Sequence, residues 1–244
     1  RLRDLMFFAL GDVKGKKVLD LGCGSGEYLE IVGKLGAEFV AGQDMDKESI
    51  EKGKRRLKES NLNFSIIAGD AMKLEFPDNH FDSCLSSDFF EHITYDQKVE
   101  IIKEVYRVLK PGGRFTIKTP NKNYHRLVIY LKRFFNIIRL KTPFIYIAHT
   151  NNNPDNEHIG LTTHAELDKL LTDNFFHTPH ITYMPLIRKP YPKELDHSYS
   201  FPNTLPSWFP GLPKVITRLL YGKKLFTEHV IISTRKTIVY GFYP

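Results

Sequence analysis

A short run of glycines follows an acidic residue near the start of the chain, in the sequence Val18-Leu19-Asp20-Leu21-Gly22-Cys23-Gly24-Ser25-Gly26. Glycines let a backbone turn sharply and approach a ligand, and the N–H groups that open the next helix can face that ligand. A dinucleotide loop spaces its glycines as G-x-G-x-x-G to seat a pyrophosphate. Here the spacing is G-x-G-x-G, and a carboxylate at Asp20 would repel a pyrophosphate. Asp20 instead favours a ligand that carries ammonium and sulfonium charges.

A second set of reactive side chains stands in Ser87-Asp88-Phe89-Phe90-Glu91-His92, directly after a predicted strand. Open α/β sheets bind ligands at the carboxyl ends of their strands, so these residues are expected at such an edge. If they are helical, Asp88, Glu91 and His92 project from one face. His92 could then act as a general base. The alternative is a turn that hydrogen bonds hold in place and that takes no part in chemistry.

The elements that would position these residues follow from the sequence pattern. Short apolar runs alternate with amphipathic stretches over the first two thirds of the chain, which predicts a parallel α/β sheet. Strands are predicted at Lys17–Leu21, Glu38–Gln43, Asn63–Ala68, Phe81–Ser86, Arg114–Thr119 and His229–Thr234, and helices at Glu27–Leu35, Lys47–Glu59, Asp96–Leu109 and Thr162–Asn174. Lys110-Pro111-Gly112-Gly113 is predicted to stop a helix and form a turn, and Thr162 or Thr163 to cap the last helix.

Two stretches break this alternation and are predicted to be insertions on the acceptor side, at 121–160 and 185–224. On a helical wheel, one face of the first would carry Leu127, Val128, Leu131, Phe134, Phe135 and Ile138, with Lys122, Arg126, Lys132, Arg133 and Arg139 mostly opposite. Such a helix could lie among the headgroups of an anionic membrane. It could equally pack as a lid over the site. The second stretch, rich in proline and aromatic residues, is expected to wall a pocket for an apolar acceptor.

The composition limits the class of protein. A chain of 244 residues with 41% apolar content is expected to be globular. The net charge of +7 favours anionic partners such as nucleic acid, a membrane surface or a phosphorylated substrate. Cys23 and Cys84 lie in predicted buried elements and suit a reducing cytoplasm. No uncharged apolar run is long enough to predict a membrane span.

Val18–Gly26 and four later segments together resemble the class I S-adenosylmethionine-dependent methyltransferases, in particular the group that includes enzymes of ubiquinone and menaquinone synthesis. The four segments are Gly42-Gln43-Asp44-Met45-Asp46, Ala68-Gly69-Asp70-Ala71, Phe81-Asp82 through Glu91-His92, and Leu109-Lys110-Pro111-Gly112-Gly113-Arg114. The resemblance implies a doubly wound, mostly parallel, seven-stranded Rossmann-like α/β sheet with an inserted cap region. It also implies a single domain over residues 1–244.

The resemblance also assigns roles to residues. Asp44 would bind the ribose hydroxyls of S-adenosylmethionine, and Asp70 with the backbone N–H of Ala71 would hold the adenine. The whole cofactor-binding set that it implies is Asp20, Gly22, Cys23, Gly24, Gly26, Asp44, Met45, Asp70, Ala71 and Ser87.

Two further candidates rest on the same resemblance. A Glu-x-x-Glu-His sequence in the polyprenyl-phenol O-methyltransferases is linked to a divalent metal. Asp88, Glu91 and His92 resemble it, with Asp88 in place of the first Glu. A Mg²⁺ or Zn²⁺ ion there could polarise an acceptor hydroxyl. His158 resembles a family histidine that precedes the next helix, and is a candidate for acid–base catalysis.

Three hypotheses for the function remain. The first is methyl transfer, preferably to oxygen, on a small apolar or lipid-linked acceptor, by a cytoplasmic protein that can sit at an anionic membrane through residues 122–141. The second is methylation of RNA or DNA, prompted by the positive charge. Against it, Ser86-Ser87-Asp88-Phe89 lacks the Asn/Asp-Pro-Pro-aromatic pattern of the amino-group enzymes of this fold. The third is a cofactor-binding subunit that activates a partner and has no turnover alone.

Overall fold

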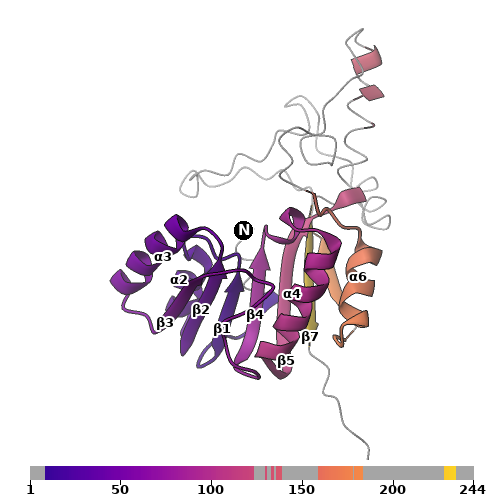
Figure 1. The fold of residues 1–244 in the computed structure, drawn as a ribbon. Helices are drawn as coiled ribbons and strands as arrows, with labels where there is room; N and C mark the ends of the chain where they lie inside the picture. The colour runs from indigo at the N-terminus through magenta and orange to yellow at the C-terminus, as the bar shows by residue number, and fades with distance from the viewer. Residues whose placement is uncertain are drawn as a thin grey trace, which may run out of the picture.

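One mostly parallel sheet runs through the middle of the structure, which is a computed structural model (Figure 1). The structure describes residues 9–123, 159–177, 179–183 and 228–234, together with 130, 133, 134 and 136–138. The seven strands lie in the order β3-β2-β1-β4-β5-β7-β6. They are β1 (Lys17–Leu21), β2 (Phe39–Asp44), β3 (Phe64–Ala68), β4 (Phe81–Ser87), β5 (Leu109–Pro120), β6 (His180–Tyr183) and β7 (Glu228–Thr234). Strands β1–β5 pair in parallel, and β7 is antiparallel to both β5 and β6.

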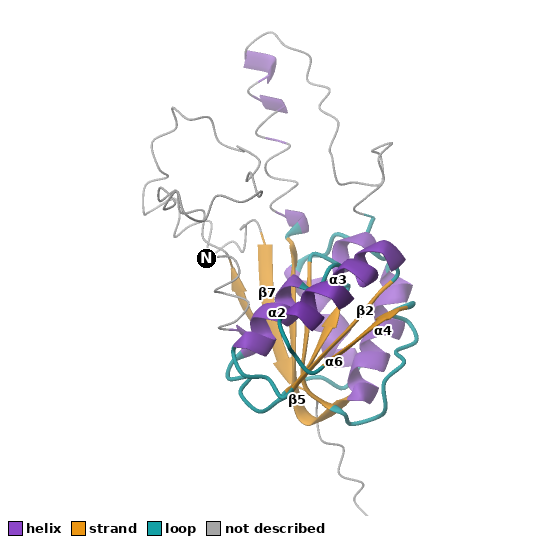
Figure 2. Ribbon diagram, turned by 90° about the vertical axis from the view of Figure 1, so that its left-hand side faces the viewer, coloured by secondary structure: helices purple, strands orange, loops and turns teal. Residues whose placement is uncertain are grey.

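Helices cover both faces of this sheet (Figures 1 and 2). They are α2 (Glu27–Lys34), α3 (Lys47–Glu59), α4 (Tyr95–Val108) and α6 (His164–Asp173), with a 3₁₀ turn, η1, at Phe90–His92. Because each of α2, α3 and α4 connects two parallel strands, the carboxyl ends of β1–β5 meet at one edge, the upper edge in Figure 1. None of the helices that the structure describes is long and apolar enough to cross a membrane.

Two hydrophobic cores, one on each face of the sheet, hold these layers together. Val18 packs with residues of α2 and α3, whereas its neighbours Leu19 and Leu21 pack with residues of α4 and α6. This alternation follows from the period of two in a strand, and burial on both faces is typical of parallel sheets. It makes the direction of each side chain along β1, β4 and β5 predictable from its position.

Most predicted elements are confirmed within two residues at each end, and three details differ. Strand β5 begins at Leu109, because Leu109 pairs with Phe81 directly after α4 and a register shift between Phe81 and Ser83 accommodates the residues that follow. The turn predicted at Lys110–Gly113 is therefore the start of a strand. Helix α6 begins at His164, because Thr163 rather than Thr162 forms its capping box with Glu166. Strand β6 was not predicted.

A close approach between β2 and the glycine loop depends on Gly42. A Cβ atom at Gly42 would lie 2.6 Å from Cys23 Sγ and 2.9 Å from Leu29 Cδ1. Gly42 itself is buried in the middle of β2, paired with Asp20 of β1. The missing side chain is what lets the loop after β1 pack against the neighbouring strand.

We expect Gly42→Ala to lower the free energy of unfolding by about 1–3 kcal/mol, because the added methyl group overpacks a rigid site. Urea denaturation of the variant and the wild-type protein measures this difference. Equal stability of the two proteins would contradict the close packing of the loop on β2.

Candidate functional site

The carboxylate of Asp20, at the end of β1, is the most buried charge beside the glycine loop. Asp20 is 2% exposed, and burial together with the nearby charge of Asp44 raises its pKa well above the usual range. Among the residues that the structure describes, no hydrogen bond or ion pair reaches this carboxylate. The ionised form of Asp20 is therefore unfavourable without a partner, and a cation placed beside it would stabilise that form strongly.

The glycine loop adopts the backbone that the sequence predicts. Gly22, Gly24 and Gly26 have φ angles of 70°, 48° and 72°, in the left-handed region that favours glycine. A Cβ at Gly22 would lie 2.8 Å from Cδ2 of Phe89, so this aromatic ring rests directly on the loop. A Cβ at Gly24 would meet nothing within 4 Å, so the loop has open space at its centre where a ligand can approach.

Asp44 closes the next strand end and contacts the same loop. Its Oδ2 accepts a hydrogen bond from the backbone N–H of Gly24 at 2.9 Å, and its Oδ1 accepts one from Asp46 N–H at 2.9 Å. Asp46 in turn caps α3. Asp44 is half-buried, and the next residue, Met45, is 75% exposed. An acid that is both oriented and accessible in this way can accept hydrogen bonds from a ligand's hydroxyl groups.

Gln43, which sequence reasoning missed as a functional residue, positions the loop after β3. Its buried amide Nε2 donates to the backbone oxygens of Asp70 at 2.7 Å and Lys73 at 3.0 Å, and its Oε1 accepts from Glu75 N–H at 3.2 Å. Asp70 itself is exposed at this edge, next to the buried Ala71. A buried amide at the end of an apolar strand must find hydrogen-bond partners, which is the signal that could have identified it.

The turn after β4 does not bring Asp88, Glu91 and His92 together as the helical interpretation expects. Asp88 has a φ of 56°, and only Phe90–His92 form a short 3₁₀ turn. Asp88 points to Lys118 of β5, Glu91 is buried, and His92 is exposed. In the part of the chain that the structure describes, no group of three or more His, Cys, Asp or Glu side chains could hold a metal ion. The expectation that these three residues share one helical face is therefore wrong.

Lys118, also missed by sequence reasoning, gives Asp88 its partner. The Lys118 ammonium lies 2.7 Å from Asp88 Oδ1 and 2.5 Å from Oδ2, and Asp88 N–H donates to the Lys118 backbone oxygen at 3.0 Å. The Ser87 hydroxyl lies 3.0 Å from Asp88 Oδ2 and 3.4 Å from the hydroxyl of Tyr28 in α2. These four side chains connect the ends of β4 and β5 to the start of α2.

Glu91 and Lys98 form a buried polar cluster behind this turn. The Thr119 hydroxyl donates to Glu91 Oε2 at 3.0 Å, and Gly160 N–H donates to the Glu91 backbone oxygen at 2.8 Å. The Lys98 ammonium donates to the backbone oxygen of Gly160. Burial raises the pKa of Glu91 to about 7 and lowers the pKa of Lys98 to about 8. The cluster ties the turn after β4 to the segment that enters α6.

The remaining predicted residues divide into two groups. Cys23 and Cys84 are buried free thiols, and Cys23 packs on Gly42 at the glycine loop. His158, the Pro-rich stretch from 185 and most of the residues between 124 and 158 lie outside the described residues. Within 122–141, Phe134 is 58% exposed and Ile138 is 61% exposed.

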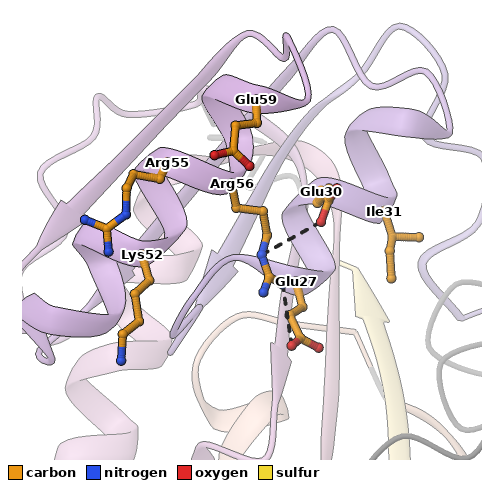
Figure 3. Close-up of a pocket in the computed structure, with 7 residues that line it drawn as sticks. All are labelled: Glu27, Glu30, Ile31, Lys52, Arg55, Arg56 and Glu59. Atoms are coloured by element: carbon orange, nitrogen blue, oxygen red, sulfur yellow. Dashed lines mark ion pairs between the residues drawn. The ribbon is translucent and has the colours of Figure 1, made fainter.

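A surface groove between α2 and α3 is separate from this site (Figure 3). It is lined by Glu27, Glu30, Ile31, Lys52, Arg55, Arg56 and Glu59, and shares none of them with the candidate cofactor residues. Arg56 lies 3.5 Å from Glu27 and 3.9 Å from Glu30. These charges balance one another within the groove, so it gives no argument for a ligand.

Known methyltransferases are similar in sequence to the part of this chain that contains the glycine loop. Residues 18–113 match the model of a methyltransferase domain family. The demethylmenaquinone methyltransferase of Geobacillus sp. (strain WCH70) is 38% identical over 106 residues, which cover 41% of this chain and 44% of that protein. The ubiquinone/menaquinone biosynthesis C-methyltransferase UbiE of Psychromonas ingrahamii is 36% identical over 110 residues, covering 43% and 42%. The chain thus matches less than half the length of these curated relatives.

Solved structures show the same fold. The geranyl diphosphate C-methyltransferase from Streptomyces coelicolor A3(2), in complex with Mg²⁺, geranyl diphosphate and S-adenosyl-L-homocysteine, matches with a TM-score of 0.63 and 18% identity. The match covers 96% of this chain and 79% of that one. At this identity the likeness concerns the fold alone. Residues 18–113 therefore match a methyltransferase domain and are similar to quinone-pathway methyltransferases over this range, and the chain has a Rossmann-like sheet.

We expect Gln43→Leu to weaken the binding of S-adenosylhomocysteine about fivefold or more, because three backbone groups of the loop after β3 lose their partner. Adenosine should lose affinity by a similar factor, since the loop lies on the side of Asp70. Isothermal calorimetry with both ligands measures this. Unchanged affinity for both would show that Gln43 does not position the loop.

We expect Glu91→Gln to change how stability depends on pH. The folded protein holds a proton on Glu91 more firmly than the unfolded chain, so its contribution is present at acid pH and is lost as the pH rises through about 7. The variant keeps an oxygen that can accept from Thr119 and removes this loss. Its advantage in free energy of unfolding should therefore grow by about 1–3 kcal/mol between about pH 4.5 and about pH 7. Urea denaturation across this range measures it, and a constant difference would contradict the buried titration.

Proposed function

We propose that this chain is an S-adenosylmethionine-dependent methyltransferase that acts on a small, apolar or lipid-linked acceptor bearing a hydroxyl group. The uncompensated carboxylate of Asp20 is the observation that carries the proposal. S-adenosylmethionine brings an ammonium and a sulfonium group, and either would relieve the negative charge that Asp20 and Asp44 create beside the glycine loop.

The other candidate residues fit the rest of this cofactor. Asp44, half-buried and oriented by two backbone N–H groups, would accept hydrogen bonds from the ribose hydroxyls, with Met45 exposed next to it. Asp70 and the backbone N–H of Ala71 would hold the adenine at the loop that Gln43 fixes. Gly24 leaves the open space that the ligand needs. Ser87, the last residue of β4, lies at the opposite end.

The acceptor is proposed from the relatives and from surface chemistry. The two curated relatives are named for quinone methylation, and the solved structure above holds geranyl diphosphate. Each of these names refers to a compound with a large apolar part, although geranyl diphosphate also carries a charged diphosphate. Two of them are called C-methyltransferases, whereas we expect the methyl group to be transferred to oxygen. A phenol or enol accommodates both, because its anion is nucleophilic at oxygen and at the conjugated carbon.

Contact with an anionic membrane through residues 122–141 is part of the same proposal. Its support is the exposure of Tyr130, Phe134, Ile137 and Ile138, large apolar side chains in a sequence that is rich in Lys and Arg. Such a surface would deliver an apolar acceptor to the carboxyl edge of the sheet.

The proposed reaction assigns no step to a metal at Asp88, Glu91 and His92. The Asp88 carboxylate is engaged by Lys118, and the Glu91 carboxyl is buried against Thr119. Methyl transfer itself is an in-line displacement at the sulfonium, for which orientation of the two reactants supplies much of the rate. His92 and His158 remain the proposed proton-accepting residues.

The proposal predicts that S-adenosylhomocysteine binds the wild-type protein and that Asp20→Asn and Asp44→Asn each weaken it more than tenfold, about 1.4 kcal/mol. Because the ammonium group of S-adenosylhomocysteine would bind the ionised form of Asp20, wild-type affinity should also fall as the pH is lowered, and Asp20→Asn should remove this dependence. Asp46→Asn, two residues after Asp44, keeps the helix cap and serves as the matched control with wild-type affinity.

Turnover is measured by incubating the protein with S-adenosylmethionine and reduced demethylmenaquinone, with mass spectrometry of both products. S-adenosylhomocysteine together with a methylated quinol supports the proposal, and the position of the methyl group separates oxygen from carbon transfer. Calorimetry without any binding of S-adenosylhomocysteine would remove it. Binding without turnover would favour the cofactor-binding subunit instead.

A further inference from the structure

Lys118 is a nearly buried cation at the carboxyl edge of the sheet, where few charges are expected. Its side chain is 7% exposed, whereas that of its partner Asp88 is 46% exposed. Lys118 lies near the end of β5 and pairs in register with Ser87, the last residue of β4. Asp88 therefore stands on the accessible side of the pair, and the ammonium lies behind it.

The direction of the Lys118 side chain follows from the alternation along β5. Phe115 and Ile117 belong to the core beneath α4 and α6, so Lys118 points to the opposite face, that of α2. Tyr28 of α2 confirms this direction. Burial raises the pKa of the Tyr28 hydroxyl, and the charges of Lys118, Asp88 and Asp20 all act on the same group. Lys118 and Asp20 thus share one neighbourhood around Tyr28.

The sheet order places this neighbourhood at the methyl end of the proposed cofactor site. From β3 to β5 the carboxyl edge carries Asp70, then Asp44, then the glycine loop after β1, then Asp88 after β4, then Lys118. Adjacent strands are about 4.8 Å apart. A ligand with adenine at Asp70, ribose at Asp44 and its charged end at Asp20 therefore directs its methyl group toward Asp88 and Lys118.

We propose that Lys118 is the cation that holds the acceptor's hydroxyl oxygen in its anionic form beside the methyl group, and that Asp88 is the counter-ion that this oxygen replaces. The inference rests on the proposed function and names its acceptor as a phenol or enol. The hydroxyl proton passes to one of the proposed proton-accepting residues, His92 or His158, as the anion forms. The oxygen, or the carbon conjugated to it, then forms a bond to the methyl carbon while the S–C bond breaks and its electron pair stays on sulfur.

This role accounts for a buried lysine at the carboxyl edge of the sheet. A carboxylate that is half exposed can rotate into solvent at small cost, whereas the ammonium has little access to water and needs an anion in contact. An acceptor anion in place of Asp88 keeps the site neutral, and a neutral acceptor does not. Lys118 therefore selects acceptors that can ionise, and Asp88 supplies the anion in contact with the ammonium in the free protein.

The test measures how strongly the protein prefers the anion of a simple phenol. The probe is 4-nitrophenol, whose anion absorbs visible light, titrated against protein saturated with S-adenosylhomocysteine. For the wild-type protein we expect the anion to bind about tenfold or more tightly than the neutral phenol, which lowers the apparent pKa of the bound probe by about one unit. Lys118→Met should abolish this preference, and Lys118→Arg should restore most of it.

Two further variants separate this role from a structural one. Asp88→Asn removes the competing anion, keeps a residue type that tolerates positive φ, and should strengthen the preference for the phenolate. Lys110→Met is the matched control, because Lys110 pairs with Asp82 at 2.6 Å between the same two strands at the amino end of β5. It should leave the preference unchanged.

The outcomes distinguish this inference from the function on which it rests. A phenolate preference that survives Lys118→Met, or one that is weakened by Asp88→Asn, would overturn the assignment of Lys118. Binding of S-adenosylhomocysteine with no phenolate preference in the wild-type protein would also overturn it and leave the methyltransferase proposal intact. Only a failure of S-adenosylhomocysteine to bind the wild-type protein would remove both.

Discussion

The buried carboxylate of Asp20 imposes a constraint on everything around it. It lies at the end of β1 without a cation, and Asp44 adds a second negative charge nearby. Placing a carboxylate in such surroundings is unfavourable for the free protein. In the proposed function, the arrangement becomes favourable once a positively charged ligand fills the loop. Gly42 lets the loop after β1 pack closely on β2, and the left-handed glycines let the loop turn beside Asp20.

The order of the strands determines where the polar side chains lie along the ligand-binding edge that we propose. Because β1 to β5 are parallel and doubly wound, their carboxyl ends form one continuous edge. Two polar side chains then fix its geometry from below: Gln43 holds the loop after β3, and Lys118 holds the turn after β4. One half of the edge presents the acids Asp44 and Asp70, and the other half presents the ion pair of Lys118 and Asp88. In our proposal, the acids match a donor that is positive, and displacement of Asp88 leaves Lys118 to match an acceptor that is negative.

Sequence patterns predict the parts of this structure that depend on local chemistry. The glycine loop, the acids at strand ends and the Thr163 cap each follow from residues close together in the chain, and β1 is predicted to the residue. Three features depend instead on partners that are remote in the sequence. The left-handed Asp88 is held by Lys118, 30 residues away. Lys98 lies on the apolar stripe of α4 and finds Gly160, 62 residues away. Strand β5 starts early because Leu109 meets Phe81. Patterns within one segment of the sequence cannot predict these contacts, because each partner lies in another segment.

The same distinction explains why the donor side of the site is easier to identify than the acceptor side. Donor binding uses backbone turns and strand ends that any sequence of this fold must build, so it leaves a recognisable pattern. In our proposal, the acceptor side is made by single charged residues, Lys118 and Asp88, on a scaffold that stays the same when they change. Replacing one lysine at the end of β5 would alter which acceptors ionise without altering the sheet. On this proposal, acceptor chemistry is encoded in contacts between β4 and β5 rather than in the glycine motif.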